Sequence, residues 1–478
     1  MQPTSLNFKE NASRALHDTQ LQRALGNVKT GFIVSRAAAR AALPEFDELR
    51  AAAAEIKNHV LENLDIYLEE YERRVLESGG HVHWARDAAE ASQIILKICQ
   101  DAGAKTVTKG KSMVSEEIGL NAALEAAGIA PVETDLGEYI IQIRHEAPSH
   151  IIAPAVHLNR DQIEKDFRDL HRSLSPERDL SQIGELVSEA RTMLRQKFLA
   201  ADVGITGANF LIAETGSSVI VTNEGNGDLT QLLPRTHIVI ASIEKLVPTL
   251  EDTSTIIRVL ARSGTGQEIT SYTTFSTGPR QEGDPDGPDA YHVVLVDNGR
   301  SAMLGSEFQD MLRCIRCGAC MNHCPVYTAV GGHSYGWVYP GPMGAVLTPQ
   351  LIGIHEGAHL PNASTFCGRC QSVCPMMIPL PKMMRHWRER DFEQKSSASL
   401  PKLALHAWAL FATRPVLYRF AANSAARVLS FLGGRKRRFS SLPLARAWTK
   451  YRDLPAPAPR TFQSLWQERE RKRMRHGR

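Results

Sequence analysis

The chain has 478 residues, of which 43% are hydrophobic and 23% are charged. This composition is typical of soluble proteins and, at this length, allows roughly two to four domains. The N-terminus has no apolar run between basic residues and a small-residue cleavage site, and no uncharged apolar run reaches about 18 residues. We therefore expect a cytoplasmic protein without an export signal or a membrane-spanning helix.

The net charge of +4 is divided unevenly along the chain. Residues 381–478 contain 23 Lys and Arg against 6 Asp and Glu, a net charge of +17, which leaves a net charge of −13 for residues 1–380. Basic segments of this kind bind nucleic acid, an anionic membrane surface or an acidic protein, or are simply solvated. We favour a solvated tail or an acidic partner, keep peripheral contact with the inner face of the membrane as an alternative, and do not expect nucleic acid.

The first part of the chain predicts an α/β fold. Residues 45–77 carry apolar side chains at helical spacing and end before a pair of glycines, which predicts one long amphipathic helix. Strands and helices then alternate. We expect strands at 81–85, 105–109 and 129–134 and helices at 87–103 and 115–128. This alternation predicts a mostly parallel sheet that helices cover on both faces.

Between residues 160 and 300 the pattern is richer in strands. A polar helical stretch at 160–199 precedes short β-rich segments, and a helix near 248–262 precedes a last strand at 290–299. The β-rich segments are 203–207, 209–215, 217–223 and 236–242. Residues 300–313 predict a helix that leads into a cysteine-rich region.

We place a domain boundary near residue 300 and divide the chain into four parts. They are an N-terminal extension, an α/β domain, a mainly helical cysteine-rich domain and a basic helical region, at 1–49, 50–300, 301–395 and 396–478.

Seven of the eight cysteines lie between residues 314 and 374, which indicates metal ligation in a reducing compartment rather than a disulfide framework. The first run, C-x2-C-x2-C-x3-C-P, consists of Cys314, Cys317, Cys320, Cys324 and Pro325. In iron–sulfur proteins the first three cysteines of this run hold one cluster, and the fourth ligates the other cluster of a pair. Zinc is the alternative, but zinc sites use cysteines in two pairs rather than in two triplets.

A second run ends in the same way but has only three cysteines, and Ser364 stands where its first cysteine would be. Cross-ligation between the runs then predicts one complete and one incomplete cluster site. The complete set is Cys314, Cys317, Cys320 and Cys374, and the incomplete set is Cys324, Cys367 and Cys370 with Ser364 at the fourth position. The fourth corner of the second cluster can be bound by serine or water, or be absent as in a 3Fe–4S cluster.

Three other side chains are candidate ligands. Cys99 lies on the apolar stripe of the helix at 87–103, so we expect an inert core cysteine. His333 and His355 lie in the spacer at 325–366 between the runs. A lone histidine is more often a surface or core residue than a ligand, and we do not expect either histidine to bind a cluster.

Polar turns of the α/β region are weaker candidates for a binding site. The segment “TKGKS” at 108–112 lacks the first glycine of a phosphate-binding loop, and an ordinary strand-to-helix turn is the simpler interpretation. Its amides with Lys109 and Lys111 could still hold an anion. The polar stretch at 214–226 could form a substrate pocket, although a plain hairpin turn is the simpler interpretation. The segment “SGTGQEI” at 263–269 lacks the third glycine of a dinucleotide fingerprint. No catalytic residue can be assigned.

The cysteine runs occur together with “TKGKSMVSEEIGLN” (108–121), “ADVGITGANFLIAETGSSVIVTNEGN” (201–226) and “STGPRQEGDPDGPDAYHVVLVDNGRS” (276–301). In this order the segments resemble the lactate utilization protein B family, over about residues 50–400. The three segments resemble its LUD domain, an α/β domain with a sugar-isomerase- and CoA-transferase-like fold. Residues 314–374 resemble its two-cluster ferredoxin-type domain.

The resemblance implies an iron–sulfur electron-transfer subunit of a three-protein system that oxidises L-lactate to pyruvate and supports growth on lactate. It implies two partners, a second iron–sulfur protein and another LUD-domain protein, and two clusters, both of the 4Fe–4S type. The ligands carried over are the seven cysteines in the two sets given above. Alternatives are an enzyme that binds a hydroxyacid at an open cluster iron, an electron-transfer subunit of another respiratory oxidoreductase, and a binding module with structural or redox-sensing clusters.

Overall fold

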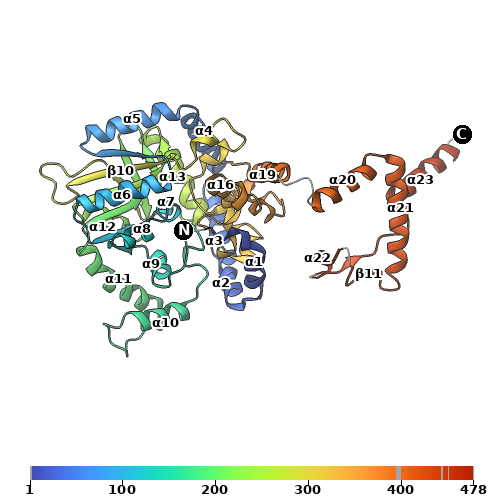
Figure 1. The fold of residues 1–478 in the computed structure, drawn as a ribbon, viewed down its shortest axis with the longest axis horizontal. Coiled ribbons are helices and arrows are strands. Elements are labelled where there is room, and N and C mark those ends of the chain that lie inside the picture. The colour runs from blue at the N-terminus through green and yellow to red at the C-terminus, as the bar shows by residue number, and fades with distance from the viewer. Residues whose placement is uncertain (1–2, 395–399, 443–444, 451, 477–478) are drawn as a thin grey trace. The chain divides into compact units, whose positions relative to one another are not determined.

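The computed structural model describes residues 3–394, 400–442, 445–450 and 452–476 (Figure 1). The chain separates into two compact units, Met1–Asp391 and Phe392–Arg478. The α/β region and the cysteine-rich region therefore belong to the same unit, and the domain boundary near residue 300 stays a prediction. Among the described residues no helix is both long and apolar enough to cross a membrane.

A six-stranded sheet forms the centre of the first unit. Its strand order is β1-β10-β7-β4-β2-β3, and every neighbouring pair is parallel. The strands are β1 (His81–Ala85), β2 (Thr106–Gly110), β3 (Ala130–Glu133), β4 (Val203–Gly207), β7 (Thr236–Ser242) and β10 (Ala290–Val296). All residues of β4 and β7 are buried, as expected of central strands covered on both faces. The mostly parallel sheet confirms the prediction.

Helices cover both faces of this sheet. In Figure 1, β10 lies between α5 (Leu64–Glu77) and α6 (Ala88–Asp101). The side chains of α6, α7 (Met113–Glu117) and α8 (Leu120–Ala126) share one hydrophobic core with alternate residues of the strands. The side chains of α5 share a second core with the residues of the opposite face. Cys99 belongs to the first core and is completely buried, as the helical pattern predicted.

Two predicted helices are interrupted. The helix predicted at 45–77 is α4 (Phe46–Glu62) followed by α5, with a break at Asn63, where the backbone leaves the helical region. The helix predicted at 115–128 is α7 followed by α8, with a break at Gly119 in the left-handed region. Both breaks let apolar side chains on each piece reach the core at different angles, which the hydrophobic period alone does not reveal.

A second, four-stranded sheet has the order β8-β5-β6-β9. It contains β5 (Phe210–Ile212), β6 (Ser217–Thr222), β8 (Leu246–Val247) and β9 (Tyr272–Ser276). The sequence analysis missed β9, whose side chains are only partly buried and whose apolar signal is weak. The helices of this part of the chain are α9 (Leu136–Ile143), α10 (Arg160–Leu170), α11 (Ile183–Leu199), α12 (Asn226–Leu232) and α13 (Leu250–Gly264).

The N-terminal residues form a short 3-10 helix, η1 (Ser5–Asn7), and three helices, α1 (Phe8–His17), α2 (Thr19–Thr30) and α3 (Phe32–Ala41). They pack against the cysteine-rich region and α13. Arg36 on α3, for example, is buried and donates a hydrogen bond of 2.9 Å to the carbonyl of Val373. The N-terminal extension is thus part of the wall around the cysteines.

The cysteine-rich region consists of short helices, as predicted. They are η3 (Ser301–Met303), η4 (Gln309–Arg313), α14 (Ala319–Asn322), α15 (Tyr327–Val330), η5 (His333–Tyr335), α16 (Gly341–Ile352), α17 (Ile354–Gly357), η6 (Leu360–Asn362), α18 (Arg369–Val373) and α19 (Leu380–Gln394). The prediction of one helix at 300–313 is wrong. Gly305, with φ of +69°, lies between η3 and η4 and ends any regular helix there.

The second unit is mainly helical. Its elements after α19 are α20 (Leu400–Ala412), α21 (Pro415–Leu432), β11 (Arg438–Phe439), α22 (Arg446–Thr449), β12 (Leu454–Pro455) and α23 (Phe462–His476). Many of its aromatic and aliphatic side chains are exposed, among them Trp408, Phe420 and Phe431. The predicted basic helical region is therefore helical, but apolar side chains share its surface with the basic ones.

Candidate metal centre

The two cysteine runs have the same backbone conformation. We call residues 314–325 the first repeat and residues 364–375 the second repeat. In each repeat the residue before the second ligand position has positive φ, +59° at Arg316 and +53° at Phe366. A left-handed glycine then starts a short helix, Gly318 before α14 and Gly368 before α18. The shared geometry places Ser364 in the second repeat where Cys314 stands in the first.

Four thiols line one small apolar cavity where the repeats meet. They are Cys314, Cys317, Cys320 and Cys374, which we call the first set. The helices α14 and α18 pack against each other, and this brings Cys374 of the second repeat to the three cysteines of the first repeat. The remaining wall of the cavity is mainly aliphatic, with Ile151 and Met343 among its residues.

Three thiols of the first set, Cys317, Cys320 and Cys374, do not ionise easily by themselves. Burial raises the pKa of Cys317 and Cys320, and neighbouring thiols raise them further. Burial likewise raises the pKa of Cys374 to about 11. Thiolates in such a site need a bound cation to offset their charge. Four sulfur ligands around one apolar cavity fit an iron–sulfur cluster, which would supply that charge and pass single electrons.

The other three cysteines, which we call the second set, also lie near one another. Burial and the nearby Cys367 raise the pKa of Cys324, and burial together with Cys324 and Cys367 raises the pKa of Cys370 to about 12. Cys324 and Cys370 are buried, whereas Cys367 is exposed. The Cys324 sulfur accepts a hydrogen bond of 3.5 Å from the backbone N–H of Tyr327. Backbone amides directed at sulfur are a common feature around iron–sulfur clusters.

Ser364 is held by contacts within the second repeat and with Arg388. Its hydroxyl accepts a hydrogen bond of 3.2 Å from the backbone N–H of Phe366. The Arg388 guanidinium lies over the Phe366 ring, 4.1 Å from its centroid, and donates to the carbonyl of Ser364. The assignment of the seven cysteines and Ser364 to two clusters stays a prediction, but the structure brings each predicted set together.

A buried hydroxyl group without a hydrogen-bond partner among the described residues lies near both sets. Tyr335 is fully buried, and its hydroxyl has no hydrogen-bond partner among the described residues. Cys324 and Cys320 both influence its ionisation, so it lies near each set. A hydroxyl in this position can donate to the sulfur of a bound cluster, which again fits the donor set.

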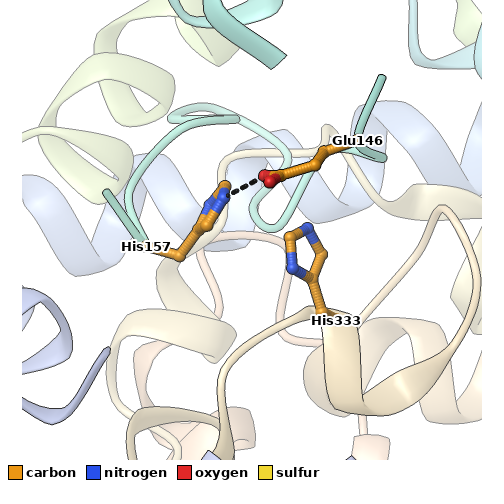
Figure 2. Close-up of side chains that lie close together, drawn as sticks. All are labelled: Glu146, His157 and His333. Carbon is orange, nitrogen blue, oxygen red and sulfur yellow. Dashed lines mark hydrogen bonds and ion pairs between the residues drawn. The ribbon is translucent and has the colours of Figure 1, made fainter. Parts of the chain in front are cut away.

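His333 and His355 do not join the cysteine sets. His333 lies beside His157 and Glu146, and ligand atoms of the three side chains lie within 4.8 Å of one another (Figure 2). His157 Nε2 lies 2.8 Å from a Glu146 carboxylate oxygen, and its Nδ1 lies 2.7 Å from the Ser149 hydroxyl. Burial and His333 lower the pKa of His157 to about 4. A neutral imidazole beside a carboxylate can ligate a divalent cation.

His355 is exposed, and its Nδ1 lies 3.2 Å from a Glu356 carboxylate oxygen. Both histidines therefore have surroundings that explain them without a cluster.

The predicted anion turn at 108–112 is occupied by protein carboxylates. Lys109 is buried and its ammonium lies 2.8 Å from Glu116 and 2.7 Å from Glu133. Lys111 pairs with Asp135 and, at 3.2 Å, with Glu224. Acidic side chains from neighbouring segments already neutralise these two lysines, which favours the ordinary strand-to-helix turn over a site for an external anion.

The polar stretch at 214–226 divides into two parts with different roles. Gly216 packs on α5, and a Cβ atom at this position would lie 2.7 Å from the backbone nitrogen of Val75. This part is a structural turn, as the simpler interpretation had it. Asn223 and Glu224, by contrast, line a cleft of 460 Å³.

We call this cleft the sheet-edge cleft. Residues that directly follow β2, β3 and β4 line it, and so do residues of α13 and the loop at 151–156. In parallel α/β sheets the carboxyl ends of the strands are the usual ligand-binding edge. Its far wall contains Arg316, Cys317 and Tyr339, so the cleft and the first set share Cys317. Sequence reasoning missed this junction.

A buried ion network connects the sheet to the first repeat. Arg300 pairs with Glu117 at 2.7 Å and with Glu244 at 3.0 Å, and Arg316 pairs with Glu244 at 3.1 Å. The Tyr339 hydroxyl donates to Glu117 at 2.7 Å. Burial opposes the ionisation of Glu244, but Arg300 and Arg316 lower its pKa to about 2. These carboxylates remain charged and fix Arg316 next to Cys317.

Three known families match the chain in succession. The LUD domain matches residues 68–296, the 4Fe-4S dicluster domain matches residues 310–378, and the C-terminal region of lactate utilisation protein B matches residues 385–471. The second match supports iron–sulfur clusters at the two repeats.

Full-length relatives give the same result. Lactate utilization protein B of Geobacillus sp. strain WCH70 is 44% identical over 467 residues, which cover 97% of this chain and 98% of the relative. The protein of the same name from Bacillus subtilis strain 168 is 45% identical over 469 residues, with 97% and 96% covered.

A solved structure of a DUF162 family protein from Deinococcus radiodurans is 17% identical, covers 49% of this chain and 98% of its own, and has a TM-score of 0.27. With relatives of this identity matched over nearly their whole length, the chain belongs to the lactate utilization protein B family.

Proposed function

We propose that this protein takes part in lactate utilization as an iron–sulfur electron-transfer subunit. The observation that carries the proposal is the pairing of two cysteine repeats into two thiol sets behind one α/β domain. Oxidation of L-lactate to pyruvate releases two electrons and two protons, and clusters accept electrons singly. The protein would work with a second iron–sulfur protein and another LUD-domain protein, which would share the hydride chemistry and pass the electrons on.

We propose two clusters of the 4Fe–4S type. The first set offers four thiols for one cluster. The second set offers three thiols, and Ser364 or a water molecule would complete it, unless a 3Fe–4S cluster forms there.

The two sets suit different steps of electron relay. Mainly aliphatic side chains form the remaining wall around the first set, whose Cys320 and Cys374 are buried. Cys367 of the second set is exposed, which leaves one edge open to a partner protein. The basic second unit would be solvated or bind an acidic partner, and its exposed aromatic side chains favour the partner.

The exposed corner also favours one alternative function. Ser364 is only partly buried, and the residues that follow it, Thr365 to Cys367, are exposed. A hydroxyacid could reach an open iron at this corner and bind there as a chelate.

Anaerobic purification of the full chain, alone and with both partners, tests the proposal. We expect about eight irons per chain for two cubanes, and reduction of an electron-accepting dye by L-lactate only when the partners are present. Lactate-dependent reduction by the isolated chain would replace the relay with the alternative function. An iron-free chain that still supports lactate oxidation with the partners would contradict both.

A further inference from the structure

Lys245 is a buried cation without a hydrogen-bond or ion-pair partner among the residues that the structure describes. Lys245 is the last residue of the 3-10 helix η2 (Ile243–Lys245) and is 8% exposed. It lines the sheet-edge cleft. Among the described residues no hydrogen bond or ion pair reaches its ammonium group. Lys57, which is also buried, instead donates to the carbonyls of Glu244 and Leu246 at 2.5 and 2.8 Å. An unpaired buried ammonium is costly, which indicates a missing anionic partner.

Arg316 supplies a second unsatisfied donor in the same wall of the cleft. One of its terminal nitrogens bonds to Glu244 at 3.1 Å, while Nη1 is buried and has no hydrogen-bond partner among the described residues. The guanidinium lies 5.3 Å from the centroid of the Tyr339 ring, which holds it in place. The backbone of Arg316 has φ of +59°, so its direction is set by the fold of the first repeat.

The charges at this end of the cleft favour an anion. Lys57, Lys245, Arg300 and Arg316 lie near Glu117 and Glu244, so the cations outnumber the carboxylates here. At the other end, Glu224 lines the cleft but is paired with Lys111. A carboxylate fits the planar donor geometry of arginine.

The remaining wall of the cleft suits the organic part of such a ligand. Apolar side chains line its middle, with Ile140, Ile152 and Leu260 among them, and Asn223 and Gln267 add amide groups. Its volume of 460 Å³ is within the range of about 300–1,000 Å³ typical of small-molecule sites.

We propose that the sheet-edge cleft binds a small monocarboxylic acid, with its carboxylate between Lys245 and Arg316 and beside Cys317. The identification of that acid as L-lactate or pyruvate rests on the proposed function, whereas the carboxylate site itself does not. Bound in this way, the acid lies against the wall that holds the first set, so its presence alters the surroundings of a cluster there.

The test is calorimetric titration of the full-length, anaerobic, iron-loaded protein with L-lactate, pyruvate, acetate and inorganic phosphate, each used separately. We expect one site for a carboxylate and weaker binding of phosphate. The Lys245→Gln variant should bind the acid about tenfold or more weakly, because it loses a charge-assisted hydrogen bond. Lys97→Gln is the matched control, because Lys97 is exposed and pairs with Asp101 on α6.

A second variant changes the shape of the cleft without changing its charge. Ile152 lines the cleft and is 36% exposed, so Ile152→Trp should narrow the cleft and weaken binding while the iron content stays normal. The electron paramagnetic resonance spectrum of the reduced first cluster should change when the acid binds to the wild type, and should not change in Lys245→Gln.

Other outcomes would overturn the inference. If Lys245→Gln shifts the cluster potential but binds the acid as tightly as the wild type does, Lys245 serves only to offset cluster charge. If iron-loaded wild type binds none of the acids, or prefers phosphate, the carboxylate site does not exist. Binding of acetate without L-lactate would retain the site and count against the proposed function alone.

Discussion

The first and second repeats have one backbone and two environments. In both repeats a residue with positive φ precedes the second ligand position, and a left-handed glycine follows it. The first repeat, however, adjoins the buried ion network and the sheet-edge cleft, whereas much of the second repeat is exposed. The sequence motif thus determines the backbone of each cysteine loop. The surroundings of the loop determine which electron donor or acceptor can reach a cluster bound there. Four changes would break or sharpen this comparison.

The largest effect is expected from Cys374→Ser. Cys374 belongs to the second repeat but lies with the first set, so its loss should remove the cluster of the first set and about half of the bound iron. Iron and sulfide counts with electron paramagnetic resonance spectra measure this. Cys99→Ser is the control and should keep all iron, because Cys99 lies in the core beside the sheet. Loss of the second cluster instead would show that the repeats do not cross-pair.

Arg300→Met should destabilise the first unit strongly. Arg300 is completely buried between Glu117 and Glu244, and its removal leaves both carboxylates without their main partner. Breaking a buried pair costs about 3–5 kcal/mol of unfolding free energy. Chemical denaturation measures the change. Arg385→Met removes an exposed pair with Glu389 and should change the unfolding free energy by about 0.5 kcal/mol or less. Equal effects of the two variants would mean that the network is not a stabilising anchor.

Acid should weaken the anchoring of the first repeat through His150. This buried imidazole lies 2.9 Å from Asn322 of α14, and its Nδ1 accepts hydrogen bonds from the backbone N–H groups of Ile152 and Ala153. Burial lowers its pKa to about 4 from an ordinary value of 6.5. Between these two values the unfolded chain binds a proton that the folded chain does not, so stability falls as the pH falls from 6.5 to about 4.

The loss over that range is about 3 kcal/mol for one such group. Denaturation midpoints measured across the range should fall less steeply in His150→Gln than in the wild type. His355→Gln, at an exposed histidine, should keep the wild-type slope. An unchanged slope in His150→Gln would contradict the role of this imidazole.

The smallest effect is expected from Ser364→Cys. A thiol at this position would complete the second set and change the iron content or the reduction potential of the second cluster only. Redox titration followed by electron paramagnetic resonance separates the two clusters. If neither property of the second cluster changes, the register that aligns Ser364 with Cys314 is wrong.

The local sequence pattern predicted the bounds of elements well where a whole element is buried in one hydrophobic core. The strands β1, β2, β3, β4, β7 and β10 lie within one or two residues of the predicted ends, except that the last strand was predicted to extend three residues further. Their apolar runs are long enough to identify buried parallel strands. The pattern failed at Asn63, Gly119 and Gly305, where a helix changes direction. Such breaks depend on the angles at which neighbouring elements pack.

The sequence by itself determined the parallel α/β sheet, the two cysteine repeats and the position of Ser364, because spacing and period carry that information directly. Only the tertiary structure decided that acidic side chains neutralise Lys109 and Lys111, while within the described part of the chain the Lys245 ammonium and one Arg316 nitrogen have no hydrogen-bond partner. The sequence around these four basic residues does not show which of them has an acidic partner. Their difference arises from partners that are distant along the chain, and only folding brings the partners within hydrogen-bonding distance.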